Sequence, residues 1–209
     1  MPPLVHHFGK YAEIVTTAFW HGEAERKLQH IRNAKTGEEL DFDFIRLNVE
    51  RDRFPFADES FDVVLCCELI EHLAEDPMHM IAEINRILKW DGQVIITTPN
   101  IISGFSIQAA LRGHSPYVFG HYNRENLYYG LGDRHNREYA PEEVKTALEA
   151  GGFEVVELVT RDSWNQPNPE ILKLLESTFV PLELRGDNIF AVGRKVSSHI
   201  ERYPAQLYQ

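Results

Sequence analysis

Short apolar runs alternate with helical patterns along the chain, and this alternation constrains the fold more than any other feature. The runs that we expect to form strands are 12–19, 42–48, 61–67, 93–98, 153–160 and 188–192. Within them, Val63-Val64-Leu65 and Val94-Ile95-Ile96 are continuously apolar, which is typical of strands that are covered on both faces. Strands that alternate with helices predict an α/β fold with a largely parallel sheet.

Capping residues predict where two helices begin. Asp76 is a good N-cap, and Pro77 suits the first helical position, where its missing N–H costs nothing. Apolar residues at helical spacing follow, and we expect Gly92 to end this helix. The second helix is predicted over 141–150, with Ala140 at its N-cap and a pair of glycines after its end.

The composition fits a globular protein and argues against some classes of partner. The chain has 209 residues, of which 43% are hydrophobic, as is usual for a globular protein. Its net charge of -11 disfavours binding to nucleic acid. Cys66 and Cys67, the only two cysteines, are adjacent in an apolar run, which is typical of buried thiols in a reducing compartment. No apolar stretch approaches the length of a membrane span, and residues 1–9 do not read as a signal peptide. We therefore expect a single cytoplasmic domain over 1–209.

The segment 102–140 differs from the rest of the chain. It is rich in Gly, His, Tyr, Asn and Arg, and only its residues 106–111 have a helical pattern. Long irregular segments in compact domains are usually lids or binding loops. This segment also follows the end of a predicted strand, where open α/β sheets bind their ligands, so we expect it to be a loop insertion on the acceptor side of a site.

Four sequence blocks resemble class I S-adenosylmethionine (SAM)-dependent methyltransferases, in the order and spacing of that family. They are Phe54-Pro55-Phe56-Ala57-Asp58-Glu59-Ser60-Phe61-Asp62-Val63-Val64, Glu71-His72-Leu73, Glu83-Ile84-Asn85-Arg86-Ile87-Leu88-Lys89 and Thr97-Thr98-Pro99-Asn100. The resemblance is to the type 11 methyltransferases and covers roughly residues 10 to 160. A later block, 134–143, resembles a subgroup associated with bacterial surface-polysaccharide and glycolipid pathways.

The resemblance implies a Rossmann-like sheet of strand order 3-2-1-4-5-7-6, mostly parallel with one antiparallel C-terminal strand. It also implies that SAM is the cofactor and lies over the carboxyl ends of the strands. The residues that it places against SAM are Asn48, Val49, Cys67, Glu68 and Glu71. The implied reaction is methyl transfer to a small-molecule or glycan/glycolipid acceptor.

Histidines are the candidate catalytic residues, because a histidine can act as a general base near neutral pH. We expect His135 to be the catalytic base, with His72 as the second candidate. The residues expected to contact the substrate are Asn100, Arg137 and Tyr139; for Arg137, an ion pair with Glu138 or Glu142 is an equal alternative. His114, His121, Asn123 and Arg124 are further loop residues that could touch substrate. Neither Glu71-His72 with His79 nor His114 with His121 has the spacing of a known ligand set, so the sequence predicts no metal site.

The front of the chain departs from the family. The first strand and its acidic-x-Gly-x-Gly loop are missing, and residues 4–10 resemble the end of the helix that follows that loop. The absent strand would be the central one. The backbone N–H and C=O groups of its neighbouring strands would then lose their hydrogen-bond partners, which would lower the stability of the fold. We expect a truncated gene, a gap closed by rearranged pairing, or a sheet completed by another chain, such as a second copy in a homo-oligomer. The alternative to an enzyme is a non-catalytic, methyltransferase-like protein that acts through a partner chain.

Overall fold

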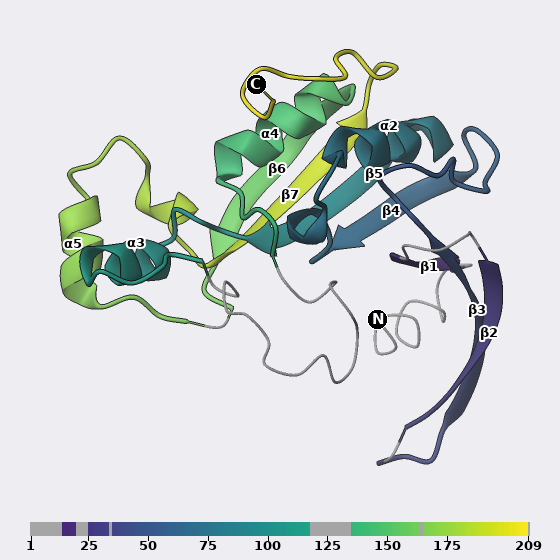
Figure 1. The fold of residues 1–209 in the computed structure, drawn as a ribbon, viewed down its shortest axis with the longest axis horizontal. Coiled ribbons are helices and arrows are strands. Elements are labelled where there is room, and N and C mark those ends of the chain that lie inside the picture. Colours follow the sequence, from purple (N-terminus) through teal and green to yellow (C-terminus); the bar gives the residue numbers. More distant parts are fainter. Residues whose placement is uncertain (1–13, 20–24, 34, 118–134, 164, 209) are drawn as a thin grey trace. The chain divides into compact units, whose positions relative to one another are not determined.

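The chain divides into two units, Met1–Phe54 and Pro55–Gln209, and the computed structural model describes its residues 14–19, 25–33, 35–117, 135–163 and 165–208. The first unit holds β1 (Thr16–Phe19), β2 (Glu25–Arg32) and β3 (Glu39–Leu47). The second unit holds β4 (Phe61–Cys67), η1 (Ile70–His72), α2 (Pro77–Ile87), β5 (Leu88–Pro99), α3 (Gly104–Leu111), α4 (Pro141–Ala150), β6 (Phe153–Arg161), α5 (Pro169–Leu175), η3 (Leu182–Leu184) and β7 (Asn188–Lys195). Strands and helices alternate in the second unit (Figure 1), so the predicted α/β class is confirmed.

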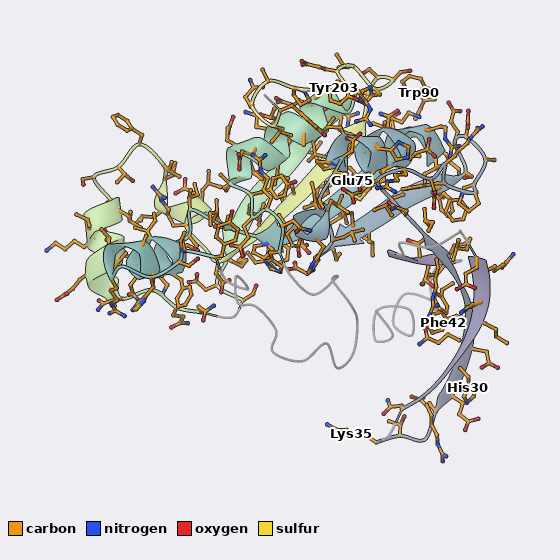
Figure 2. All side chains as sticks on the ribbon, in the orientation of Figure 1. His30, Lys35, Phe42, Glu75, Trp90 and Tyr203 are labelled. Carbon is orange, nitrogen blue, oxygen red and sulfur yellow. The ribbon has the colours of Figure 1, made fainter. Side chains whose placement is uncertain are left out.

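A three-stranded sheet of order β1-β3-β2 forms the described part of the first unit. β1 runs parallel to β3, and β2 is antiparallel to it. Figure 2 shows His30 and Phe42 on the two strands of the β2–β3 hairpin and Lys35 at its turn. In that turn the side-chain oxygen of Asn33 accepts the backbone N–H of Lys35 at 2.9 Å, a local bond that favours a turn over a strand. β2 was not among the predicted strands, because its sequence has no apolar run.

The second unit contains a four-stranded sheet of order β4-β5-β7-β6. β4 and β5 are parallel, and β7 is antiparallel to both β5 and β6. Three strands therefore run in one direction and the C-terminal strand runs in the other, as predicted. The order is the 4-5-7-6 part of the expected topology. The missing central strand remains a prediction.

The two continuously apolar runs differ in burial. Val94 and Ile96 of β5 are only 1% and 0% exposed, whereas Val63 and Leu65 of β4 are 49% and 42% exposed. Among the described residues, every pairing of β4 is with β5, so β4 lies at an edge of this sheet. The prediction of coverage on both faces was therefore correct for Val94 and Ile96 and wrong for Val63 and Leu65.

α2 and α4 pack on the same face of the four-stranded sheet (Figure 1). Ile81 and Ile84 of α2 and Leu148 of α4 are buried. Burial of such a side chain stabilises the fold by about 1.5–3 kcal/mol relative to leaving it in water. α4 has the predicted bounds, and Gly152 follows it with a φ of 88°, a left-handed conformation that favours glycine.

The N-terminus of α2 is as predicted, but its end is not. The Oδ1 of Asp76 accepts the backbone N–H of His79 at 3.2 Å, which confirms Asp76 as the N-cap. α2 ends at Ile87, and Gly92 lies within β5, so the prediction that Gly92 ends the helix was wrong. A Cβ at Gly92 would lie 2.8 Å from the carbonyl oxygen of Lys89. Gly92 is therefore needed for a close backbone approach at the start of the strand and not for a helix cap.

Two polar side chains of the α2 region bind the end of the chain. Asn85 is buried, and its side-chain amide donates to the carbonyl oxygens of Gly151 at 2.8 Å and Ser197 at 2.9 Å. The carboxylate of Asp76 accepts hydrogen bonds from the guanidinium of Arg202 and, at 2.8 Å, from the hydroxyl of Tyr208. The C-terminal segment is thus held against both ends of α2.

Candidate active site

The carboxyl ends of β4 and β5 form one edge of the second unit, because the two strands are parallel and Cys67 pairs with Thr97. Glu68 follows β4 with a φ of 50°, and its N–H donates to the carbonyl oxygen of Thr97 at 2.9 Å. Its Oε1 accepts the hydroxyl of Thr97 at 2.7 Å and the side-chain amide of Asn188 at 3.1 Å. Glu68 therefore joins the ends of β4, β5 and β7.

Glu71 lies in η1, the short 3-10 helix that follows β4, and it is completely buried. Its Oε2 accepts the hydroxyl of Thr98 at 2.8 Å. Among the described residues its other oxygen, Oε1, has no hydrogen-bond partner. Burial raises the pKa of Glu71 to about 7, and the nearby carboxylate of Glu68 acts in the same direction.

His72 and His135 meet beside Glu71. The Nε2 of His72 is 3.8 Å from the Oε1 of Glu71, and the rings of His72 and His135 pack edge to face with centroids 4.9 Å apart. His135 is 8% exposed, and its Nδ1 lies 2.9 Å from the Oε1 of Glu138. A carboxylate at that nitrogen favours the tautomer whose Nδ1 carries the proton and whose Nε2 presents a lone pair.

Backbone hydrogen bonds bring the block that contains His135 to this edge. The N–H groups of Asn136 and Arg137 donate to the carbonyl oxygen of Glu71 at 2.8 and 3.2 Å, and the side-chain amide of Asn136 donates to the carbonyl oxygen of His72 at 2.7 Å. Further along, the N–H of Ile101 donates to the carbonyl oxygen of Tyr139 at 3.1 Å. The residue before the 102–140 segment and the last residues of the segment are thereby fixed to the carboxyl ends of the sheet.

Arg137 and Tyr139 have partners within the protein. The guanidinium of Arg137 donates to the Oε1 of Glu143 at 2.6 Å and to the carbonyl oxygen of Leu207 at 3.2 Å, and it lies over the ring of Tyr139. The ion pair that we weighed as an alternative exists, but with Glu143 in place of Glu138 or Glu142. Tyr139 is 1% exposed, and burial raises the pKa of its hydroxyl. Their contact with substrate remains a prediction.

Asn100 also forms hydrogen bonds inside the protein. It is fully buried, and its side-chain amide donates to the carbonyl oxygens of Leu184 at 3.0 Å and Gly186 at 2.8 Å. Its side-chain oxygen accepts the N–H of Ile102 at 3.1 Å. This network joins the end of β5 to η3 and β7. A direct contact between Asn100 and substrate remains a prediction.

Two of the residues predicted to contact SAM lie in the first unit, just after β3. Asn48 and Val49 are both buried. The side-chain oxygen of Asn48 accepts the N–H of Glu50 at 2.9 Å, and its backbone N–H donates to the carboxylate of Asp52 at 2.7 Å. Asn48 therefore organises the turn after β3, and its role toward a cofactor remains a prediction.

Some predicted residues lie outside the described part of the chain or have no direct tie to the site. His121, Asn123, Arg124 and residues 4–10 lie outside the described residues, and His114 is exposed just after α3.

Cys66 and Cys67 are free thiols whose pKa values are raised by burial. Glu138 was not predicted as a site residue, although its position three residues after His135 was a readable signal.

The comparisons with known proteins agree with the sequence motifs. Residues 4–96 match the family model of a methyltransferase domain. This match covers less than half of the chain and overlaps three of the four motifs described above. No curated protein matches the chain.

Several solved methyltransferase structures are similar to the chain. A SAM-dependent methyltransferase from Thermotoga maritima is 20% identical, with 73% of this chain and 64% of that chain covered and a TM-score of 0.48. One from Methanosarcina mazei is 13% identical, with 73% and 66% covered and a TM-score of 0.48. The 1,6-didemethyltoxoflavin-N1-methyltransferase of Burkholderia thailandensis, solved with S-adenosylhomocysteine, is 19% identical, with 74% and 51% covered and a TM-score of 0.38. The chain thus spans less than two thirds of the length of these proteins. In the described part of the chain, no helix is long and apolar enough to cross a membrane.

Proposed function

We propose that this chain binds SAM over the carboxyl ends of its strands and transfers the methyl group to a small-molecule or glycan/glycolipid acceptor. The observation that carries the proposal is the meeting of two sequence blocks at one edge of the sheet. Glu71 and His72, from the block after β4, lie against His135, from the segment expected on the acceptor side. The four motifs and the methyltransferase family match support the same function.

In this proposal the cofactor and the acceptor approach the edge from different elements. Cys67 and Glu68 form the floor under SAM, with Glu71 at the opening of the next loop. The cofactor contact that the resemblance implies for Asn48 and Val49, in the first unit, is a separate expectation. Asn100, Arg137 and Tyr139 shape the acceptor side, either by direct contact or by holding the segment that makes it. The glycan/glycolipid class rests on the resemblance of the block at 134–143 alone.

In methyl transfer the protein mainly has to position the acceptor atom. Methyl transfer is an in-line displacement at the sulfonium methyl group, and alignment of the acceptor atom can supply about 7–11 kcal/mol of the barrier reduction. An acceptor hydroxyl also benefits from a base that takes its proton. His135 suits that role, because Glu138 contacts its Nδ1 and the tautomer described above leaves Nε2 able to accept a proton. His72 is the second candidate.

A calorimetric titration with SAM tests the cofactor site. Cys67→Trp places a large ring at the end of β4, and we expect it to weaken SAM binding by at least about tenfold, which corresponds to about 1.4 kcal/mol. The matched control is Gln93→Trp, at an exposed position in the middle of the neighbouring strand β5. Loss of SAM binding in both variants, or in neither, would contradict the proposed place of the cofactor.

A methyl-transfer assay with a panel of hydroxylated small molecules and glycans tests the catalytic role of His135. We expect His135→Ala to lower kcat by about 10²–10⁴ while the Kd for SAM stays within about twofold, because a general base acts in the chemical step. His30→Ala, at an exposed position of β2, is the control. An unchanged kcat in His135→Ala would remove His135 from the reaction.

The second candidate is a non-catalytic protein that works through a partner chain. The exposure of Val63 and Leu65 on the edge strand β4 favours it, because unpaired strand edges with apolar side chains invite another strand. The partner could be a second copy of this chain. A folded protein that gives no heat with SAM and sediments as a dimer would support this candidate. A monomer that binds SAM would rule it out.

A further inference from the structure

A cluster of three metal-ligating side chains lies at the edge described above. One ligand atom each from Glu71, His72 and His135 can be chosen so that all three lie within 4.8 Å of one another. A metal with bonds of about 2.0–2.2 Å to such ligands holds them about 3.3–3.5 Å apart in a tetrahedral arrangement. Small rotations of the three side chains would therefore close the cluster around an ion. We propose that Glu71, His72 and His135 bind a divalent transition metal of the zinc class.

The carboxylate of Glu71 is the observation that points to a ligand. Its side chain is 1% exposed, and among the described residues its Oε1 accepts no hydrogen bond although it faces the His72 ring. A buried polar atom without a partner is costly, and a cation is the partner that best compensates a carboxylate oxygen. The other oxygen, Oε2, is held by Thr98, so the side chain presents Oε1 in a fixed direction.

The surroundings of His135 have the form of the outer shell of a metal site. Metal-bound histidines usually donate their second ring N–H to a carboxylate or a backbone oxygen, which fixes the ring and its tautomer. In this chain the Nδ1 of His135 lies 2.9 Å from the carboxylate of Glu138, which is itself buried. In the proposed site, the Nε2 of His135 is therefore the ligand atom.

The donor set indicates the class of metal. Two imidazoles and one carboxylate suit Zn²⁺ and its neighbours in the first transition row, whereas Mg²⁺ and Ca²⁺ prefer oxygen ligands alone. Three protein ligands leave a position open, as in catalytic zinc sites. A hydroxyl or water bound there would lose its proton more easily. In the metal-bound protein, His72 and His135 would thus act as ligands, and the acceptor side would be activated by the ion in place of a histidine base.

The spacing of residues that are close along the chain predicted no metal site. His135 joins Glu71 and His72 through the fold alone. The proposal does not depend on methyl transfer, since it concerns binding of the ion and is measured without SAM.

Titration of the full chain with Co²⁺ and Zn²⁺ tests the proposal. We expect one Co²⁺ per chain, visible ligand-field absorption of a four- or five-coordinate ion, and displacement of Co²⁺ by Zn²⁺. Glu71→Gln keeps the shape of the side chain and its bond to Thr98, and we expect this variant and His135→Asn each to weaken binding at least tenfold. His30→Ala, at an exposed position of β2, is the matched control and should bind as the unaltered chain does.

Two results would overturn the proposal. The first is a folded, unaltered chain that shows no stoichiometric binding of either ion, which would mean that hydrogen bonds alone hold the cluster. The second is binding that persists at full affinity in Glu71→Gln and His135→Asn, which would place the ion elsewhere. The first result needs no variant, so the proposal can be tested even if the substituted proteins do not fold. Metal binding and SAM binding are measured in separate titrations. A failure of the metal proposal can therefore be told apart from a failure of the proposed function.

Discussion

Glu71→Gln removes a buried ionisable group while keeping the shape of the side chain, and it makes the stability of the metal-free protein less dependent on pH. Burial raises the pKa of Glu71 to about 7 from an ordinary value of 4.5. Between these two values the folded protein holds a proton that the unfolded chain has released. The contribution of Glu71 to the free energy of unfolding is therefore fully present below pH 4.5 and is lost as the pH rises through about 7.

The two pKa values set the size of the effect. They differ by about 2.5, and one pKa unit corresponds to about 1.36 kcal/mol, so the loss is about 3 kcal/mol. This is a large share of a typical domain stability of about 5–15 kcal/mol. From mild acid to above pH 8, the free energy of unfolding of the unaltered protein should therefore fall measurably relative to that of the glutamine variant.

Urea denaturation in the presence of a chelator, at several values from about pH 4.5 to 8.5, measures this difference. The difference in the free energy of unfolding between Glu71→Gln and the unaltered protein should grow by about 3 kcal/mol in favour of the variant. Glu149→Gln, at an exposed position of α4, should follow the unaltered protein. Two stability curves that stay parallel over the whole range would refute the reasoning, because Glu71 would then titrate alike in the folded and unfolded chains.

Three further predictions concern the scaffold. Asn85→Ala should lower the free energy of unfolding by about 2–4 kcal/mol in urea denaturation, because two carbonyl oxygens lose their donor, and Asn85→Leu, which fills the space, should not restore it. For Asp76, burial would raise the pKa, but hydrogen bonds from Arg202 and Tyr208 outweigh it and the pKa is lowered. Its stabilising contribution is therefore present above the unfolded pKa and lost as the pH falls through the folded one. An Arg202→Met variant, measured by urea denaturation extended well below pH 3.8, should lack part of this acid dependence. Gly152→Ala should lower Tm by several degrees, because the residue has a φ of 88° and a Cβ there would meet a backbone oxygen at 2.5 Å; an unchanged Tm would show that the segment can shift.

Local signals explain which parts of the fold were predictable. Asp76 and Pro77 predicted the start of α2, and the pattern over 141–150 predicted α4, because a helix begins through contacts within one turn. β2 could not be predicted from its own residues, because pairing with β3 and the turn at Asn33 make it a strand. Gly92 resembled a helix stop, yet its need for a glycine comes from a close backbone approach inside β5.

The candidate site was predictable in part. The ends of neighbouring parallel strands meet at one edge, so Glu68, Glu71 and His72 could be placed together from the sequence. His135 was expected at the same edge, and the structure brings it against His72. The hydrogen-bond partners were not predictable. Asn100 is a polar residue at a strand end, which suggests a ligand contact, but its amide instead joins two carbonyl oxygens, and only the fold reveals that arrangement.

The closure of the 102–140 segment at both ends has a consequence for how such a protein could change its specificity. The N–H of Ile101 is bound to Tyr139, and Asn136 is bound to Glu71 and His72, so the stretch enters and leaves through anchors that belong to the sheet. The entropy of closing a loop grows only slowly with its length. Insertions or replacements between Ile101 and His135 would therefore leave His135 where it is. In the proposed enzyme, the residues between Ile101 and His135 could be exchanged for others that bind a different acceptor. Glu71, His72 and His135 would keep their positions.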